Sequence, residues 1–155
     1  MDWATLAGTA LGVILGAGST VTVERIGWRR EHTTRERSTR RELYSHYLAA
    51  LSLATHQLRD LKRFGSLPLD ERRRRAGEIL STSGAYESRY RVLISARETL
   101  EEPVEQAFNC LRHLRNLLEE PEECAESMWD SAVTGIGEAI TALKHAMRRD
   151  LSQPE

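Results

Sequence analysis

The sequence is poor in cysteine and proline and has almost no excess of charge of either sign. Two cysteines in 155 residues exclude a disulfide-built scaffold. Four prolines and ten glycines exclude collagen-like and low-complexity classes. A net charge of -1 excludes a chain that binds polyanions through its overall charge. The length fits one domain with at most one appended element.

Motifs of the common enzyme classes are also missing from the sequence. It contains no Gly-x-Ser-x-Gly turn, no glycine-rich phosphate loop and no dinucleotide fingerprint. It also lacks the Glu-x-x-His pairs that di-iron helical bundles use. We therefore expect a non-enzymatic protein with no catalytic residues, no cofactor and no small-molecule substrate.

The sequence contains one weak metal-binding pattern. Cys110 and His113 lie one helical turn apart, a spacing that zinc-binding pairs use. A structural zinc site needs four ligands, and Cys124 and His145 complete it only if a fold is assumed. We expect no metal site.

The most distinctive segment is the uncharged run from Trp3 to Val23. It holds twelve apolar residues, four glycines, four threonines and one serine. A helix of this length spans about 31 Å, close to the roughly 30 Å hydrocarbon core of a bilayer. Residues 1–23 are therefore predicted to be a transmembrane anchor. A cleaved signal peptide and a buried soluble helix stay open as alternatives, although no basic residue precedes the run.

Small residues recur every four positions within this run. Such residues share one helix face and let a second backbone approach closely in lipid. The pattern predicts a helix-packing face for another copy or another membrane helix, and accidental spacing in a glycine-rich anchor is the alternative. The face consists of Ala4, Gly8, Gly12, Gly16 and Thr20.

Arginines gather directly after the predicted anchor. Since basic residues favour the cytoplasmic side, their position predicts a cell-membrane protein with its N-terminus outside and its C-terminal part in the cytoplasm. Residues 24–42 would form a basic helical stalk that contacts lipid phosphates. The arginines are Arg25, Arg29, Arg30, Arg35, Arg37, Arg40 and Arg41.

The remaining chain has the apolar spacing of four helices and no strand pattern. The fold class is therefore predicted as all-α, with an antiparallel four-helix bundle over residues 43–151 and a tail over 152–155. We call the stripe of residues that each helix is expected to bury its seam. The seam of the first helix is Tyr44, Tyr47, Leu51, Ala54, Leu58 and Leu61. The seam of the second is Ala76, Ile79, Ser83, Tyr86, Tyr90 and Leu93. The last two are Val104, Ala107, Phe108, Leu111, Leu114 and Leu118, then Trp129, Ala132, Val133, Ile136, Ile140, Leu143 and Met147.

Capping and breaking residues set the expected helix boundaries. Asp70 and Thr99 are predicted N-caps of the second and third helices, and Gly84 is a possible kink. Gly135 and Gly137 are predicted to allow close packing of the fourth helix.

Charge is unevenly distributed along the chain. Residues 24–64 carry ten basic and five acidic side chains, whereas residues 98–126 carry two basic and nine acidic ones. We expect the acidic region to lie away from the stalk. The run from Arg72 to Arg75 is interpreted as a solvated helix surface, because four consecutive helical residues point in different directions.

The order of these parts resembles a set of small, uncharacterised membrane-anchored helical proteins from actinobacteria. The shared strings are Met1-Asp2-Trp3, Thr9-Ala10-Leu11-Gly12-Val13, Trp28-Arg29-Arg30, Arg41-Glu42-Leu43-Tyr44 and Ala146-Met147-Arg148-Arg149-Asp150-Leu151. The resemblance covers most of the chain in layout and only short strings in identity. It implies a membrane anchor and a helical domain, and it implies no activity.

Three functions are compatible with these features of the sequence. The favoured one is a single-pass membrane protein whose cytoplasmic bundle binds a protein partner or itself. The first alternative is a membrane-active, holin-like oligomer assembled through the glycine face. The second is a soluble nucleic-acid-associated bundle in which residues 3–23 form a core helix.

Overall fold

The computed structural model describes residues 35–64, 67–119 and 126–153, and all regular structure in these ranges is helical. This confirms the all-α fold class. Contacts divide the chain into Met1–Ser38 with Glu155, and Thr39–Pro154, which contains the bundle. The helices are a first helix within residues 35–64, α2 (Leu69–Thr82), α3 (Ala85–Ser95), a short 3-10 helix η1 (Glu98–Leu100), α4 (Glu101–Glu119) and α5 (Glu126–Ser152).

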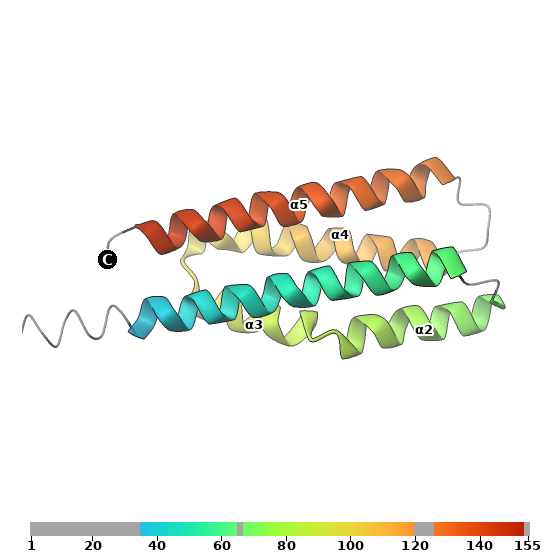
Figure 1. The fold of residues 1–155 in the computed structure, drawn as a ribbon, viewed down its shortest axis with the longest axis horizontal. Helices are drawn as coiled ribbons and strands as arrows, with labels where there is room; N and C mark the ends of the chain where they lie inside the picture. The colour runs from blue at the N-terminus through green and yellow to red at the C-terminus, as the bar shows by residue number, and fades with distance from the viewer. Residues whose placement is uncertain (1–34, 65–66, 120–125, 154–155) are drawn as a thin grey trace, which may run out of the picture. The chain divides into compact units, whose positions relative to one another are not determined.

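Side-chain contacts between residues far apart in the sequence show that neighbouring helices of the bundle run antiparallel (Figure 1). The first helix and α5 meet at both ends, since Tyr44 contacts Asp150 and Lys62 lies 3.8 Å from Glu126. The start of α2 contacts the end of α4, because Arg72 donates to the carbonyl of Leu118. Helices α2 and α3 lie end to end as one rod. The predicted four-helix bundle is therefore confirmed for the described residues.

Three of the four predicted seams form the core. Every predicted residue of the α4 seam is buried, and the α5 seam is buried with Val133 and Ile140 at its edge. Of the predicted seam residues of the first helix, only Leu61 is partly exposed. Apolar side chains at three-four spacing need a shared interior to leave water, and four such stripes provide one.

The second predicted helix is broken, and its predicted seam is wrong beyond the break. Helix α2 ends at Thr82, and Gly84 has φ 76°, a left-handed conformation that a residue without Cβ adopts readily. The turn resets the helical phase, so α3 buries Ala85 and Val92. Tyr86 and Tyr90 are consequently exposed instead of buried.

The predicted N-caps Asp70 and Thr99 and the predicted close packing at Gly135 and Gly137 are also wrong. Helix α2 begins one residue before Asp70, after Pro68, and Thr99 lies inside η1. A Cβ at Gly135 or Gly137 would meet no atom within 4 Å, so the described structure does not need glycine there for packing.

In the described part of the chain, no helix is both long enough and apolar enough to span a bilayer. The run over residues 1–23, on which the membrane prediction depends, lies outside the described residues.

Candidate functional site

The residues predicted to pack in or beside a membrane lie mostly outside the described structure. All five small residues of the anchor face, together with Arg25, Arg29 and Arg30, fall in residues 1–34. Of the other arginines, Arg35, Arg37 and Arg41 are exposed and Arg40 is partly buried, all in the helix of residues 35–64. The structure therefore leaves the lipid-contact prediction untested.

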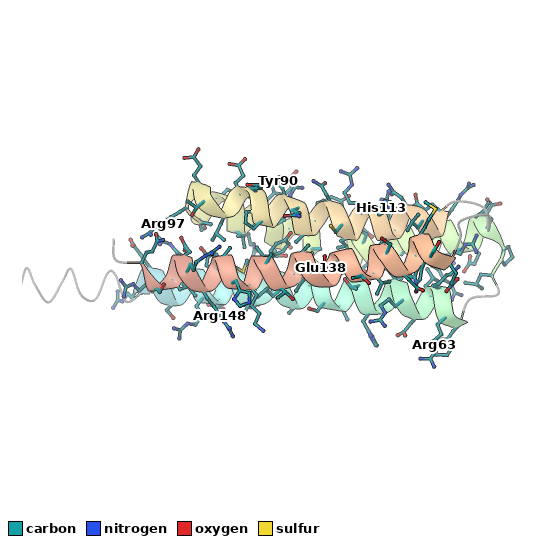
Figure 2. The ribbon with its side chains drawn as sticks, turned by 90° about the horizontal axis from the view of Figure 1, so that it is seen from above. Arg63, Tyr90, Arg97, His113, Glu138 and Arg148 are labelled. Carbon is teal, nitrogen blue, oxygen red and sulfur yellow. The ribbon has the colours of Figure 1, made fainter. Side chains whose placement is uncertain are left out.

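A buried carboxylate joins three elements at one end of the bundle. The side chain of Asp150, near the end of α5, is only 1% exposed. The Tyr44 hydroxyl donates to its Oδ2 at 2.8 Å, and the Arg97 Nε lies 3.7 Å from its Oδ1. Figure 2 labels Arg97 at this end of the bundle. The cluster fixes the first helix, the η1 segment and α5 relative to one another.

Sequence reasoning missed this cluster, although a signal for it existed. Asp150 follows Leu143 and Met147 at three-four spacing, so it continues the buried seam of α5. Arg72 stands in the same way four residues before the buried Ala76. A charged residue in seam phase is buried at a cost unless it is paired, and both of these residues are paired.

The four arginines of residues 72–75 contact α4 or pair within α2, and they do not form one basic patch. Arg72 is buried, and its Nε donates to the carbonyl of Leu118 at 2.9 Å, while the Nε of Arg73 donates to that of Glu119 at 2.7 Å. These carbonyls belong to the last turn of α4, where helix carbonyls lack intrahelical partners. Arg74 and Arg75 form ion pairs with Glu71 on their own helix. The solvated surface predicted for the run is therefore wrong for Arg72, which is buried, and holds for Arg73, Arg74 and Arg75, which are exposed.

Tyr47 is the second buried tyrosine of the first helix. Its hydroxyl donates to the carbonyl of Val104 at 3.0 Å and so ties the first helix to α4. Burial raises the pKa of Tyr47 well above its ordinary value near 10, and burial with the Asp150 hydrogen bond does the same for the pKa of Tyr44. Both hydroxyls therefore stay protonated in the folded bundle when the unfolded chain begins to lose those protons.

Alkaline pH is expected to destabilise the bundle through these two tyrosines. A raised folded-state pKa contributes stability that is present below the unfolded pKa of about 10 and is lost as the pH rises above it. Between pH 10 and 11 the free energy of unfolding should fall by up to about 1.4 kcal/mol per tyrosine. Urea unfolding of the full chain in mild detergent, followed by circular dichroism at 222 nm from pH 8 to 11, measures this slope. Tyr47→Phe should remove the contribution of Tyr47 to this slope. An unchanged slope in this variant would contradict the claim that Tyr47 contributes to it.

An aromatic and ionic contact holds α3 against α4. The Arg89 guanidinium forms a two-point ion pair with Glu105 at 2.7 and 2.9 Å, and its carbon lies 4.6 Å from the centre of the Phe108 ring. The Tyr86 ring meets Phe108 edge-on, with centroids 4.8 Å apart. These contacts cover Phe108 and leave the outer part of α3 facing solvent.

The outer face of α3 carries three of the six large hydrophobic side chains that are exposed among the described residues. Tyr86, Tyr90 and Ile94 are 39%, 55% and 84% exposed, and they follow one another at four-residue spacing. They therefore share one helix face, which we name the α3 face. Arg89 lies 4.9 Å from the Tyr90 ring beside it. Tyrosine and arginine are enriched at protein interfaces, whereas scattered surface hydrophobics are ordinary.

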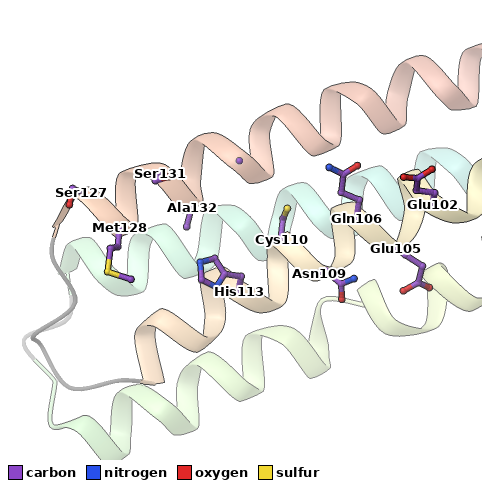
Figure 3. A pocket seen from close by; sticks show the side chains of 11 residues that line it. Glu102, Glu105, Gln106, Asn109, Cys110, His113, Ser127, Met128, Ser131 and Ala132 are labelled. Carbon is purple, nitrogen blue, oxygen red and sulfur yellow. The ribbon is translucent and has the colours of Figure 1, made fainter.

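A groove between α4 and α5 is lined by Cys110 and His113, the two residues at the spacing of a zinc-binding pair (Figure 3). It has a volume of about 840 Å³, and Cys110, His113 and Met128 line it. Burial raises the pKa of the Cys110 thiol, which disfavours the thiolate form that metals bind. Within the described ranges, no group of three or more His, Cys, Asp or Glu side chains is arranged to hold a metal ion. Cys124 lies outside the described residues.

The described acidic residues between 98 and 126 do not form one region, contrary to expectation. Helix α4 runs the length of the bundle, so its acidic residues are divided between the ends. Glu98, Glu101 and Glu102 begin η1 and α4 at the Arg97–Asp150 end. Glu126 begins α5 at the opposite end, near Lys62.

No protein-family model, no curated protein and no solved structure matches this chain.

Proposed function

We propose that the protein is a non-enzymatic, single-pass membrane protein whose cytoplasmic bundle binds protein partners. The observation that carries the interaction part is the α3 face. Three large apolar or aromatic side chains stay exposed at one helical phase, beside arginines that are already placed by ion pairs. Rigid aromatic anchors next to arginine are the usual high-energy contacts of a protein interface.

The membrane part of the proposal is supported by the sequence. The uncharged run of residues 3–23 is long enough to span a bilayer, and seven arginines follow it within 18 residues. In this arrangement the anchor keeps the bundle at the inner membrane surface, and the α3 face is available to a partner there.

Fractionation of cells that express the full chain tests the membrane part. The chain is expected in the membrane pellet after an alkaline carbonate wash and in the supernatant only after detergent is added. A variant that lacks residues 3–23 is the matched control and should move to the soluble fraction. Recovery of the full chain in the soluble fraction without detergent would contradict the membrane part of the proposal.

Affinity capture of the detergent-extracted chain tests the interaction part. Ile94→Glu places a charge on the α3 face without touching the core, and it should reduce the captured partner at least about 30-fold. Met128→Glu makes the same kind of change at an exposed side chain on α5 and should leave capture within about twofold. Equal capture by all three chains would remove the α3 face from the proposal.

A further inference from the structure

Exposed charge on α5 is divided between the two halves of the helix. The first half exposes Glu126, Asp130 and Glu138 and no basic residue. The second half contains one carboxylate, Asp150, which is buried and accepts a hydrogen bond from Tyr44. The side chains of its basic residues are all exposed: Lys144, His145, Arg148 and Arg149. The second half of α5 therefore presents positive charge to solvent.

Two of these basic residues share one face of α5. Lys144 and Arg148 are four residues apart, so their side chains are neighbours on the helix surface. Neither forms an ion pair with a residue that the structure describes, whereas Arg74, Arg75 and Arg91 are paired with glutamates on their own helices. Basic residues in the last helical turn complement the helix dipole, but these two stand before the last turn. Their charge is therefore available to an anionic ligand.

The fold adds an arginine of the first helix to this surface. Arg41 is exposed and forms no ion pair with a described residue. It is three residues from Tyr44 and therefore its neighbour on the helix surface, and Tyr44 contacts Asp150 of α5. Figure 2 labels Arg148 toward this end of the bundle. We name the set of Arg41, Lys144 and Arg148 the basic surface.

Three carboxylates at this end of the bundle lie away from the basic surface. Glu42 lines a groove against α2 and α3, together with Ser83 and Glu87. Glu98 and Glu101 begin η1 and α4, and Figure 2 shows α4 and the first helix on opposite sides of α5. These carboxylates therefore do not neutralise the basic surface.

The place of the basic surface in the chain indicates which polyanion it meets. The described residues begin at residue 35, and residues 24–34 connect them to the end of the predicted anchor. An extended chain reaches about 3.6 Å per residue, so this connection spans at most about 40 Å. The phosphate groups of an anionic leaflet attract basic residues near its surface. An anchored bundle therefore has such phosphates within reach of its basic surface.

We propose that the basic surface binds the phosphate groups of anionic lipids, so that the bundle lies with α5 and the first helix against the membrane. Each arginine offers a phosphate a planar fork of donors, and Lys144 offers a point charge. Figure 1 shows the rod of α2 and α3 on the side of the bundle opposite α5, so the α3 face stays open to a protein partner. The inference rests on the membrane part of the proposed function and deepens it by adding residues of α5, far from the stalk in sequence.

The test measures how close α5 lies to the lipid headgroups. The full chain with Cys110→Ser and Cys124→Ser is incorporated into vesicles that contain a lipid with a fluorescence quencher on its headgroup. Thr141→Cys, at an exposed position three residues before Lys144, is labelled from outside with an impermeant dye. Its quenching should be at least about fivefold stronger in vesicles of phosphatidylcholine and phosphatidylglycerol than in vesicles of phosphatidylcholine alone, because only the former attract basic residues.

Charge reversal identifies the residues that bind the lipid. Arg148→Glu should reduce the quenching of the Thr141→Cys label in anionic vesicles at least about threefold. Arg112→Glu is the matched control, since it reverses an exposed arginine of α4 that forms no ion pair with a described residue, and quenching should stay within about 1.5-fold. Circular dichroism at 222 nm checks that both variants are folded.

A second label position separates a bound α5 from mere closeness of this end of the bundle to the membrane. Ser95→Cys places the dye at the exposed end of α3. In anionic vesicles this label should be quenched at least about threefold less than the label at Thr141→Cys, because the attraction acts on the side of α5 and the first helix.

The remaining outcomes each overturn the inference. Equal quenching in neutral and anionic vesicles, or equal loss in Arg148→Glu and Arg112→Glu, would mean that the basic surface does not select anionic lipid. Equal quenching of the two labels would mean that the end of the bundle, and not the side of α5, approaches the lipid. If anionic lipid gives no quenching while duplex DNA binds the full chain and Arg148→Glu abolishes that binding, the ligand is a nucleic acid. Failure of the full chain to float with either kind of vesicle would contradict the proposed function as well, whereas flotation without quenching contradicts this inference alone.

Discussion

Replacing Phe108 with alanine is expected to lower the free energy of unfolding by about 3–5 kcal/mol. Phe108 is buried in the core on α4, and its ring is covered by the Tyr86 ring and the Arg89 guanidinium from α3. Truncation removes the apolar contact of the ring and leaves a cavity between α4 and α3. Since domains of this size are stable by about 5–15 kcal/mol, the change removes a large part of the total.

Denaturant unfolding of the full chain in mild detergent, followed by circular dichroism at 222 nm, measures this loss. Leu53→Ala is the control, because it truncates a large apolar side chain at an exposed position on the first helix. It should change stability by less than about 0.5 kcal/mol. A loss below about 1 kcal/mol for Phe108→Ala would mean that α3 does not pack on α4 as described.

Replacing Arg97 with methionine is expected to cost about 2–3 kcal/mol at neutral pH. Removing one partner of a buried ion pair leaves the other charge uncompensated, which typically costs about 3–5 kcal/mol. A somewhat smaller loss is expected here, since the Arg97 side chain is 27% exposed and its Nε is 3.7 Å from the Asp150 oxygen. The cost arises at Asp150, whose Oδ1 accepts no hydrogen bond from the described residues.

A double-mutant cycle separates this electrostatic cost from lost packing. Asp150→Asn removes the charge and keeps an oxygen that can accept the hydrogen bond from Tyr44. In the unchanged chain this substitution should destabilise the bundle, whereas in the Arg97→Met background it should stabilise it. The same unfolding assay gives the four free energies. An identical effect of Asp150→Asn in both backgrounds would show that the two residues are not coupled.

The sequence predicts the bundle well where one apolar period runs through a whole helix. The seams of α4 and α5 continue without interruption from Val104 to Leu118 and from Trp129 to Met147, and they are buried as expected except for Val133 and Ile140, which are partly buried. The prediction fails at α3 for a local reason. One left-handed residue, Gly84, restarts the period, and a pattern continued across it places Tyr86 and Tyr90 on the wrong face.

The candidate surfaces are harder to predict from sequence than the core. The α3 face depends on the phase that Gly84 sets, and the groove lined by Leu61, Phe64 and Ile79 depends on the packing of the first helix against α2. Tertiary packing decides both. Asp150 is different, since its seam position can be read directly from its spacing to Met147.

The contact between α2 and the end of α4 also bears on how the bundle folds. Two carbonyls of the last α4 turn are satisfied by Arg72 and Arg73, which stand 46 residues earlier in the chain. That turn therefore gains its full set of hydrogen bonds only after α2 has docked. Local unfolding should then open the start of α2 and the end of α4 as one cooperative unit, although a long stretch of chain separates them.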